Sequence, residues 1–438
     1  MRTIDDIAVA GRRVLVRADL NVPLDGGQIT DDGRIRASLP TLTALMSLGA
    51  KVIVCAHLGR PKGKPDPRYT LAPVADRLGE LLGRPVELAT DIVGPSAHAA
   101  IAAMRPGGVV MLENLRFDRA ETSTDDMERG YFADRLAAPA DLYVADGFGV
   151  LHRKHASVYD VALRLPSVAG YLVRAEVGAL SRLTGDIRRP YVVVLGGAKV
   201  TDKFGAIDDL IGRADQILIG GAMAFPFLAA RGEEVGTSRL DTSQIDVAAA
   251  YLVQAARAGT EIVLPTDLVV AAEPAADAPH EVVAADAIPA NRAALDIGPQ
   301  TADTFAASIR AAKTVFWNGP MGVFELSPFA DGTRAVAQAM ADSDAFTVVG
   351  GGDTDAAIGA LGFAGPMFGY VSTGGGASLE FIQGKTLPGL AALDALSTLD
   401  ALPALDALPA LDALSALDAL DALETAGTAE RLPAPAGS

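Results

Sequence analysis

Short runs of β-branched and other apolar residues alternate with longer amphipathic stretches along the first part of the chain. Residues 14–19, 51–55, 109–112 and 142–145 have the composition of buried strands, whereas residues 39–48 and 71–82 have the spacing of helices. Apolar strands that alternate with helices are typical of a parallel sheet covered on both faces. The pattern therefore predicts an α/β fold.

A second set of strand-like runs follows, and most of its members lead straight into glycine. These runs are residues 191–195, 216–219, 261–264, 314–317 and 346–349. The stretch 167–183 between the two sets is amphipathic and lacks the composition of a linker, so we interpret it as a helix that joins two domains. A length of 438 residues also exceeds what one hydrophobic core usually serves. We expect domains at residues 1–170 and 171–386, followed by a terminal segment, 387–438.

Composition narrows the class of partner. Only 5% of the residues are aromatic and the net charge is -17, which opposes binding to nucleic acid or to an anionic membrane. The charge is uneven: residues 1–170 hold 21 basic and 21 acidic side chains, residues 171–386 hold 15 and 25, and residues 387–438 hold 1 and 8. The partners should therefore be small molecules, and the neutral first half is the better place for an anion.

The compartment and the membrane question follow from a few residues. A single cysteine, Cys55, cannot form an internal disulfide, and Asp5 and Asp6 stand where a secretory signal would be basic and then apolar. The longest uncharged run, 356–379, contains seven glycines and Pro366, so it is not a membrane span. We expect a cytoplasmic protein.

Charged and polar groups follow the strands of the first half. Ligands of open parallel sheets bind at the carboxyl ends of the strands. The groups in those positions are Asp19, Asn21, His57, Arg60, Arg116 and Arg153, and Arg34 is a further basic residue near a turn. Any one arginine is more often a solvated surface residue, but several at neighbouring strand ends suit a carboxylate that bears a phosphate.

Glycines take the corresponding places in the second half. They lie in residues 196–203, 220–223, 317–325, 350–354 and 373–378, and Lys199 and Lys203 are one helical turn apart. Backbone amides at helix N-termini bind phosphate, so this half is predicted to hold a nucleotide. Neither a P-loop nor a dinucleotide fingerprint is present, which argues against a dehydrogenase. A single glycine-rich turn would be ordinary strand-to-helix geometry, but five in one domain favour a site.

The motifs together resemble those of the phosphoglycerate kinase family, over roughly residues 1–390. They are Arg17-Ala-Asp-Leu-Asn-Val-Pro23, His57-Leu-Gly-Arg-Pro61, Glu113-Asn-Leu-Arg-Phe117, Gly196-Gly-Ala-Lys-Val200, Trp317-Asn-Gly-Pro-Met-Gly-Val-Phe-Glu325, Gly350-Gly-Gly-Asp-Thr354 and Ser372-Thr-Gly-Gly-Gly-Ala-Ser378. The resemblance implies a monomer of two Rossmann-like domains with a hinge. It also implies that the last part of the chain returns to the first domain.

The resemblance further implies a role for each matching residue. Asp19, Asn21, Arg34, His57, Arg60, Arg116 and Arg153 would bind 3-phosphoglycerate. Gly197, Lys199, Lys203, Asn318, Pro320, Glu325, Gly350, Gly351, Gly352, Asp353 and Thr354 would bind ATP or ADP, with Asp353 nearest Mg²⁺. Arg34, Lys199, Gly352 and Gly375 would stabilise the transferring phosphoryl group. A carboxylate nucleophile is already ionised at neutral pH, so no general base is expected.

Some positions depart from the family pattern. Val150 stands where the family has a hydroxyl residue, Tyr370 where it often has histidine, Pro226 where it commonly has threonine, and Gln383 where glutamate is common. These departures leave open a paralogue with an altered carboxylate acceptor. A nucleotide-binding scaffold without activity is the other alternative, but it would lose the basic residues of the first half, which are present here. His152 and His155 have an H-x-x-H spacing, but without an acidic helix partner we do not interpret them as metal ligands.

The last part of the chain is a repeat. Asp394, Asp400, Asp406, Asp412 and Asp418 recur every six residues, and Pro403 and Pro409 interrupt the pattern. A period of six fits neither a helix stripe nor a strand face, so we expect this segment to be disordered in part. The alternative is an acidic and apolar segment that folds on a partner.

Overall fold

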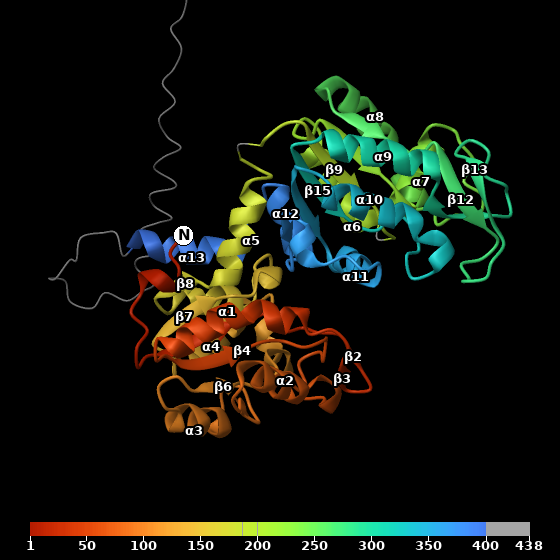
Figure 1. The fold of residues 1–438 in the computed structure, drawn as a ribbon. Coiled ribbons are helices and arrows are strands. Elements are labelled where there is room, and N and C mark those ends of the chain that lie inside the picture. Colours follow the sequence, from red (N-terminus) through yellow and green to blue (C-terminus); the bar gives the residue numbers. More distant parts are fainter. Residues whose placement is uncertain (186, 199, 400–438) are drawn as a thin grey trace, which may run out of the picture. The chain divides into compact units, whose positions relative to one another are not determined.

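The computed structural model describes residues 1–185, 187–198 and 200–399. Residues Met1–Leu396 form one compact unit, which contains both large sheets. Figure 1 shows the elements of residues 1–170 (red to yellow) gathered around one sheet, and most elements after residue 190 (green to blue) gathered around another.

The first sheet is formed by six parallel strands, which confirms the α/β prediction for this half. Their order differs from their order in the chain, as the crossovers of a doubly wound fold require. The order is β5 (Glu87–Leu88), β6 (Val109–Met111), β4 (Lys51–Cys55), β1 (Arg13–Arg17), β7 (Leu142–Ala145) and β8 (Ser167–Ala169). An isolated bridge pairs Thr3 with Ala169 at the β8 edge.

Helices cover both faces of this sheet, and the alternation along β1 decides which residue meets which helix. Val14 and Val16 pack in one cluster with α1 (Gly33–Ser47) and α2 (Ala72–Leu82). Leu15 packs in another with α3 (Pro95–Ala103) and α4 (Asp126–Ala137). Both faces are apolar because both are buried, which is why the strands read as continuous apolar runs.

The second sheet also has six parallel strands, and it confirms the predicted second set of strands. Their order is β11 (Glu261–Val263), β10 (Gln216–Ile219), β9 (Tyr191–Leu195), β15 (Thr314–Asn318), β16 (Phe346–Gly350) and β17 (Tyr370–Val371). One face packs on α6 (Val200–Leu210) and α7 (Ala224–Ala230), with α8 (Ile245–Ala258) outside α7. The other packs on α9 (Pro299–Ala311) and α10 (Asp331–Ala341). Two further helices, α11 (Gly352–Ala360) and α12 (Gly376–Ile382), follow β16 and β17.

Two small antiparallel sheets were not predicted. One contains β13 (His280–Ala284), β12 (Asp267–Ala271) and β14 (Ala293–Ile297), and the other pairs β2 (Leu24–Asp25) with β3 (Gln28–Ile29). Most of β13 is exposed, and β2 and β3 have two residues each, so none of these three strands carries the apolar run that signals a buried strand. β12 does carry such a run and is buried along its whole length, and the prediction missed it.

The prediction of one helix over 167–183 is wrong at its start. Residues 167–169 are the edge strand β8, and α5 (Tyr171–Ser181) begins only after Gly170. Two buried side chains cap α5: the Tyr171 amide donates to Thr41 Oγ1 (2.9 Å) and the Leu172 amide to Asp146 Oδ1 (3.1 Å). A strand, a turn and a capped helix are therefore compressed into the stretch that the sequence pattern presented as one amphipathic element.

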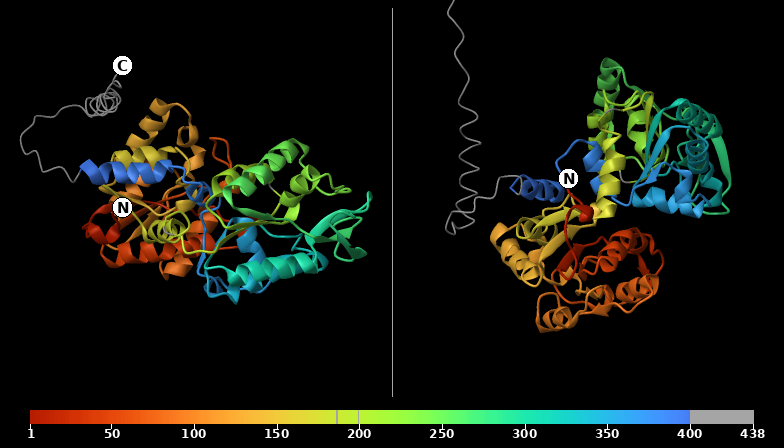
Figure 2. Two further views of the ribbon diagram at one scale, coloured as in Figure 1. Left: turned by 90° about the horizontal axis from the view of Figure 1, so that it is seen from above. Right: turned by 60° about the vertical axis from the view of Figure 1, so that its left-hand side comes forward.

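The final helix, α13 (Pro388–Leu399), lies against the first half of the chain. The Gly389 amide donates to the Leu151 carbonyl (2.9 Å), and Leu387, Ala392 and Leu393 are buried. Figures 1 and 2 show α13 beside the elements of residues 1–170 in each view. The repeat residues 400–438, including Asp400 to Asp418, lie outside the described residues. Within the part that is described, no helix is both long and apolar enough to span a membrane.

Candidate active site

The strand ends of the first half bring the predicted basic residues together. Asp19 and Asn21 follow β1, His57 and Arg60 follow β4, Arg116 lies in a 3₁₀ helix after β6, and Arg153 follows β7. Asn21 Oδ1 accepts from the Gly59 amide (2.8 Å) and Arg116 Nη1 donates to the Gly59 carbonyl (2.6 Å). The turn after β4 is thus held from both neighbouring strand ends.

Arg34 and Asp19 form an ion pair at the same edge of the sheet. Arg34 is the second residue of α1, and its Nη1 contacts Asp19 Oδ2. Asp19 is almost fully buried, whereas a third of the Arg34 side chain is exposed. The pair therefore leaves part of the Arg34 guanidinium open to a ligand.

A buried arginine lies behind this surface. Arg17, the last residue of β1, is 1% exposed, and its Nη2 lies 3.1 Å from His57 Nδ1. Its Nε donates to Ser157 Oγ (2.8 Å) and its Nη1 to the Ala18 carbonyl (2.5 Å). The prediction from sequence placed Arg17 in a motif but not in the site. The signal was available, because an arginine inside an apolar strand is unusual unless it is paired.

Burial and the closeness of the positive groups lower the pKa values of several residues in this cluster. Burial, with help from Arg153 and Arg17, lowers the pKa of Arg116 to about 10. Burial, followed by Arg17, Arg116 and Arg153, lowers the pKa of His57 well below its usual range. Burial likewise lowers the pKa of His155 to about 3. The arginines stay charged and the histidines stay neutral at physiological pH, so the cluster attracts an anion with guanidinium groups.

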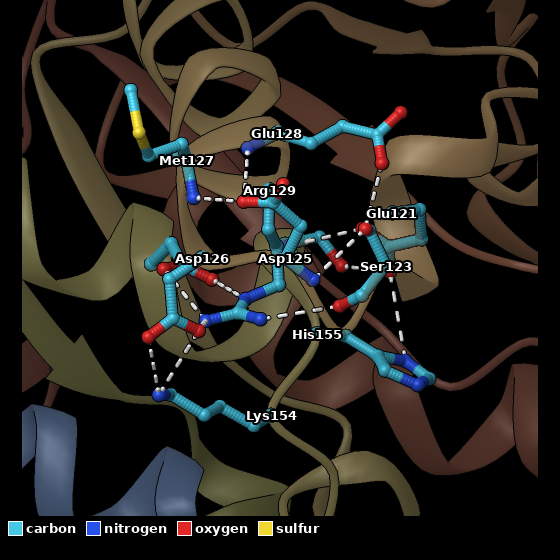
Figure 3. A network of polar contacts seen from close by, with 12 residues as sticks. Glu121, Ser123, Asp125, Asp126, Met127, Glu128, Arg129, Lys154 and His155 are labelled. Atoms are coloured by element: carbon cyan, nitrogen blue, oxygen red, sulfur yellow. Dashed lines mark hydrogen bonds and ion pairs between the residues drawn. The ribbon is translucent and has the colours of Figure 1, made fainter.

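A network of polar contacts supports the turn that carries Arg153, and Figure 3 shows it. Lys154 Nζ reaches Asp126 (3.3 Å), and Asp126 also pairs with Arg129 (2.5 Å). His155 Nδ1 lies 3.8 Å from Glu121 Oε1. His155 and Glu121, neither of them among the predicted site residues, are the inner members of this network.

Two departures from the family pattern are explained here. Val150 is 1% exposed and packs in the core cluster, so its missing hydroxyl does not face the basic surface. Tyr370 lies beside the buried Glu176, and burial followed by the Glu176 carboxylate raises the pKa of the Tyr370 hydroxyl. Nothing in the structure explains Pro226, which is buried in α7.

In the second half, Lys203 points back to the strand ends. It is 9% exposed, and its Nζ donates to the carbonyls of Gly196 (2.8 Å) and Asn318 (3.3 Å). Gly197, at φ +89°, lies beside it. Lys199, the other predicted lysine, lies outside the described residues.

The start of α11 contains the second set of predicted residues. Gly351 has a φ of +92° and precedes the helix, while Gly352 and Asp353 form its first turn. Thr354 Oγ1 accepts from the Gly319 amide (2.7 Å) and donates to the Gly350 carbonyl (2.8 Å). Thr354 therefore fixes the turn after β15 against the turn after β16.

Two cavities open at these strand ends, and Asp353 lines both. The first, of about 600 Å³, is lined by Lys203, Gly205, Asn318, Gly351, Gly352, Asp353, Thr354, Gly375, Gly376, Leu379, Glu380, Gln383 and Lys385. The second, of about 730 Å³, has Gly197, Pro320 and Glu325 in its wall together with apolar residues such as Phe225 and Leu268. Gly350 is in neither wall; it packs against the Phe316 ring.

The loop before α12 connects the first cavity with the first half of the chain. Gly375, at φ +55°, precedes α12. The Glu176 carboxylate of α5 accepts from the Thr373 amide (2.7 Å) and from Ser372 Oγ (2.7 Å). A Cβ on Gly149 would lie 2.6 Å from Asp19 Oδ2 and 3.5 Å from the Thr373 carbonyl oxygen. Residues 372–376 thus lie beside both the cation cluster and the glycine-lined cavity.

Metal binding was predicted for Asp353 alone. Among the described residues, no group of three or more His, Cys, Asp or Glu side chains could hold a metal ion. Mg²⁺ is usually held by one or two carboxylates together with substrate phosphates, so a single carboxylate at a helix N-terminus that faces two cavities fits this cation.

Guanidinium groups at one set of strand ends and backbone amides at another are the elements that stabilise a phosphoryl group in transfer. Comparison with known proteins shows that the chain is a phosphotransferase of the kinase type. A model described as phosphoglycerate kinase matches residues 4–385. The chain belongs to the phosphoglycerate kinase family.

Individual relatives agree along nearly their whole length. The chain is 60% identical over 402 residues to a phosphoglycerate kinase of Streptomyces avermitilis, with 90% of this chain and all of that protein covered. It is 60% identical over 399 residues to one of Salinispora arenicola, covering 90% and 99%. The solved phosphoglycerate kinase of Coxiella burnetii superposes with a TM-score of 0.80 at 38% identity, covering 90% and 99%. That of Pyrococcus horikoshii gives 0.82 at 33% identity, covering 91% and 100%.

Proposed function

We propose that the protein transfers a phosphoryl group reversibly between 1,3-bisphosphoglycerate and ADP, giving 3-phosphoglycerate and ATP, as a step of glycolysis and gluconeogenesis. One observation carries the proposal. In a chain of this family, a cluster of cations at the ends of the first sheet accompanies glycine-lined cavities at the ends of the second. An acid that bears a phosphate suits the former, and a nucleotide suits the latter.

The acid substrate is assigned to the first half. Its ligands are Asp19, Asn21, Arg34, His57, Arg60, Arg116 and Arg153. Two observations support the assignment. Asn21 and Arg116 both bind the backbone of Gly59, and the neighbouring arginines help to lower the pKa of Arg153 after its burial. Arg17 joins them as a buried support behind His57.

The nucleotide is assigned to the two cavities of the second half. Its phosphates would lie in the first, against the amides of residues 350–354 and near Lys203. Its base and ribose would lie in the second, where apolar side chains face the base and the Glu325 carboxylate can accept from ribose hydroxyls. Asp353, in both walls, would hold Mg²⁺, which neutralises phosphate charge when bound.

Catalysis needs no proton transfer, because the attacking carboxylate is already ionised. Arg34 from the first half, and Lys199 with the amides at Gly352 and Gly375 from the second, would compensate the charge that develops on the phosphoryl group. Since these donors belong to different domains, the domains must close about a hinge near α5, and closure excludes the water that would hydrolyse the acyl phosphate.

The remaining assignments complete the proposal. We assign residues 1–170 to the acid-binding domain, residues 171–386 to the nucleotide domain, and residues 387–438 to a return segment and tail. We expect a cytoplasmic monomer that binds small molecules and neither nucleic acid nor membranes. A chain ending at Leu396 should keep its turnover, because it retains the whole compact unit.

A coupled assay tests the central claim. Purified protein with 3-phosphoglycerate, ATP and Mg²⁺ should form an acyl phosphate that a coupling dehydrogenase consumes, and turnover should stop when chelator removes the cation. The same assay with other phosphorylated carboxylates addresses a different acceptor. No product above background with 3-phosphoglycerate, in protein that binds ADP in calorimetry, would reject the proposed reaction.

A further inference from the structure

We propose that Glu121 is a positioning residue for the acid-substrate site. Through Ser157 it holds Arg17, and Arg17 fixes His57 as an imidazole whose proton is on Nε2. The inference rests on the assignment of the acid substrate to the first half.

Four buried side chains form one continuous line of contacts. Glu121 is 0% exposed, and it accepts from the Ser157 amide at Oε2 (3.0 Å) and from Ser157 Oγ at Oε1 (2.6 Å). Ser157 Oγ is in turn 2.8 Å from Arg17 Nε, and Arg17 Nη2 is 3.1 Å from His57 Nδ1. The Ser157 carbonyl also accepts from the Tyr143 hydroxyl (2.9 Å), so the serine is held on three sides.

The chemistry of these groups fixes the direction of every hydrogen bond. A guanidinium has donors only, so Ser157 Oγ must accept from Arg17. The single hydroxyl hydrogen of Ser157 is then left for Glu121, which accepts at both oxygens. At the other end His57 Nδ1 must accept from Arg17, so a neutral His57 carries its hydrogen on Nε2.

The line also places a negative charge behind a group of positive ones. The Arg17 guanidinium donates to Ser157, to the Ala18 carbonyl and to His57, and Glu121 is the carboxylate one hydroxyl away. A buried cation is costly unless it is paired and hydrogen-bonded. Glu121 supplies the compensating negative charge from the buried side of Arg17. Arg17 can therefore hold His57 without a carboxylate on the side that faces the ligand.

The consequence for His57 is a fixed hydrogen-bond donor. Burial and three arginines lower the pKa of His57 well below its usual range, so the ring stays neutral. A neutral ring with its proton on Nε2 donates to an oxyanion over the whole physiological pH range. His57 would bind the acid substrate without acting as a pH switch.

Glu121→Gln tests the inference with little change in shape. An amide nitrogen cannot accept, so the substituted side chain places a donor against the Ser157 amide or against the Ser157 hydroxyl hydrogen. We expect the KM for 3-phosphoglycerate to rise about tenfold, the effect of losing one charge-assisted hydrogen bond, with the KM for ATP unchanged. Ser157→Ala should give a similar rise without changing any charge, and the double variant should rise no further than either single variant.

Glu128→Gln is the matched control. Glu128 lies seven residues after Glu121, at the start of α4, where it accepts from Ser123 Oγ (2.7 Å) and pairs with Arg119 (2.7 Å) (Figure 3). It should leave both KM values unchanged. A nitrogen NMR spectrum of histidine-labelled protein, which has only five histidines, should show His57 as the Nε2–H tautomer in the wild type and a shifted ring in Glu121→Gln.

The outcomes separate the inference from the site on which it rests. If Glu121→Gln fails to fold, Ser157→Ala decides. The proposed role of Glu121 and Ser157 would be rejected if Ser157→Ala left both the KM for 3-phosphoglycerate and the His57 spectrum unchanged, while Arg116→Ala still weakened binding of the acid substrate. If Arg116→Ala also has no effect, the assignment of the acid substrate to this half is wrong and the inference falls with it.

Discussion

The two halves of the chain use different parts of the polypeptide to face an anion. The first half uses side chains: His57, Arg116 and Arg153 lie at strand ends above the buried Arg17. The second half uses backbone: its cavity walls are rich in glycine, with positive φ at Gly197, Gly351 and Gly375 among others.

The difference determines what each half needs from the rest of the protein. Buried guanidinium groups need counter-charges and hydrogen-bond partners in the layer below, which Glu121, Ser157 and Asp19 provide. Backbone amides need only a conformation that no Cβ obstructs. Loss of a side chain should therefore damage the first half most, and gain of one should damage the second.

The largest effect is expected from Arg34→Ala. If Arg34 compensates charge on the phosphoryl group in transfer, kcat should fall about 10² to 10³-fold, the usual cost of one such donor. Steady-state kinetics measures it. Arg36→Ala is the control, since Arg36 lies on the same helix, is exposed and pairs with Asp32. A rise in KM with kcat unchanged would show that Arg34 binds substrate but takes no part in the transfer.

Gly319→Ala is the matching break in the second half. Gly319 has a φ of +102°, and a Cβ there would overlap the Gly196 carbonyl and the Lys203 ammonium. Strain and overlap together should cost about 2–4 kcal/mol and abolish most ADP binding. Chemical denaturation and calorimetry measure the two effects. Gly359→Ala, in α11 with no heavy atom within 4 Å, should be neutral or slightly stabilising; normal ADP affinity in Gly319→Ala would contradict the comparison.

Each half buries several carboxyl groups, and one from each, Asp146 and Asp296, should respond differently to pH. Burial raises the pKa of Asp146 from 3.8 to about 7. The folded protein then holds this proton more tightly than the unfolded chain, so the stabilisation is complete below about pH 4 and is lost as the pH rises through about 7. Asp146→Asn removes the effect. The free energy of unfolding of the variant minus that of the wild type should be about 2–3 kcal/mol larger at pH 8 than at pH 5.

Asp296 provides the contrast. Burial raises its pKa to about 8, but both its oxygens accept from backbone amides, those of Ile297 (2.9 Å) and Gly332 (2.8 Å). Asp146 Oδ2 has no hydrogen-bond partner among the described residues, so an amide nitrogen fits there, whereas at Asp296 it would face a donor. Asp296→Asn should destabilise at both pH values. If Asp146→Asn and Asp296→Asn changed the free energy of unfolding equally at both pH values, the missing hydrogen-bond partner of Asp146 would not be what distinguishes the two sites.

The smallest effects are expected at exposed cations, and they should separate the two substrates. Arg60→Ala should raise the KM for 3-phosphoglycerate about fivefold and leave ADP affinity unchanged, because an exposed charge contributes about 1 kcal/mol. Lys385→Ala, in the wall of the first nucleotide cavity, should do the reverse. Calorimetry with ADP and the coupled assay measure both effects. A loss of ADP affinity in Arg60→Ala, together with a raised 3-phosphoglycerate KM in Lys385→Ala, would show that the two substrates were assigned to the wrong halves.

Sequence patterns were sufficient for the large sheets because every long strand is buried on both faces. β4, β7, β9 and β10 coincide with predicted runs, since continuous apolar character marks such strands. Three of the four edge strands of the large sheets, β5, β8 and β17, have two or three residues and carry no pattern of their own. Of the antiparallel strands, β13 is mostly exposed and offers no apolar run, whereas the buried run of β12 was overlooked.

For the candidate site, the residues directly after the strands could be predicted, but the buried residues behind them could not. Charged residues directly after strands could be assigned because strand ends meet at one edge of a sheet. The layer beneath could not, because nothing local to Ser157 indicates that it contacts Arg17 from 140 positions away in the chain, or that Glu121 holds Ser157 there. Arg17 itself was visible as a charge in an apolar run, and only its burial against His57 explains why it is there.

The packing of α13 has a consequence for synthesis on the ribosome. The strands of the first half come from one continuous stretch, so that half can begin to fold once residue 170 has emerged. Its surface at Leu151 and Val158, however, is covered by Gly389 and its neighbours. At about 5–20 residues per second, synthesis of residues 171–393 takes roughly 10–45 s. During that interval the nascent first half exposes an apolar patch that only the last helix of the folded unit covers.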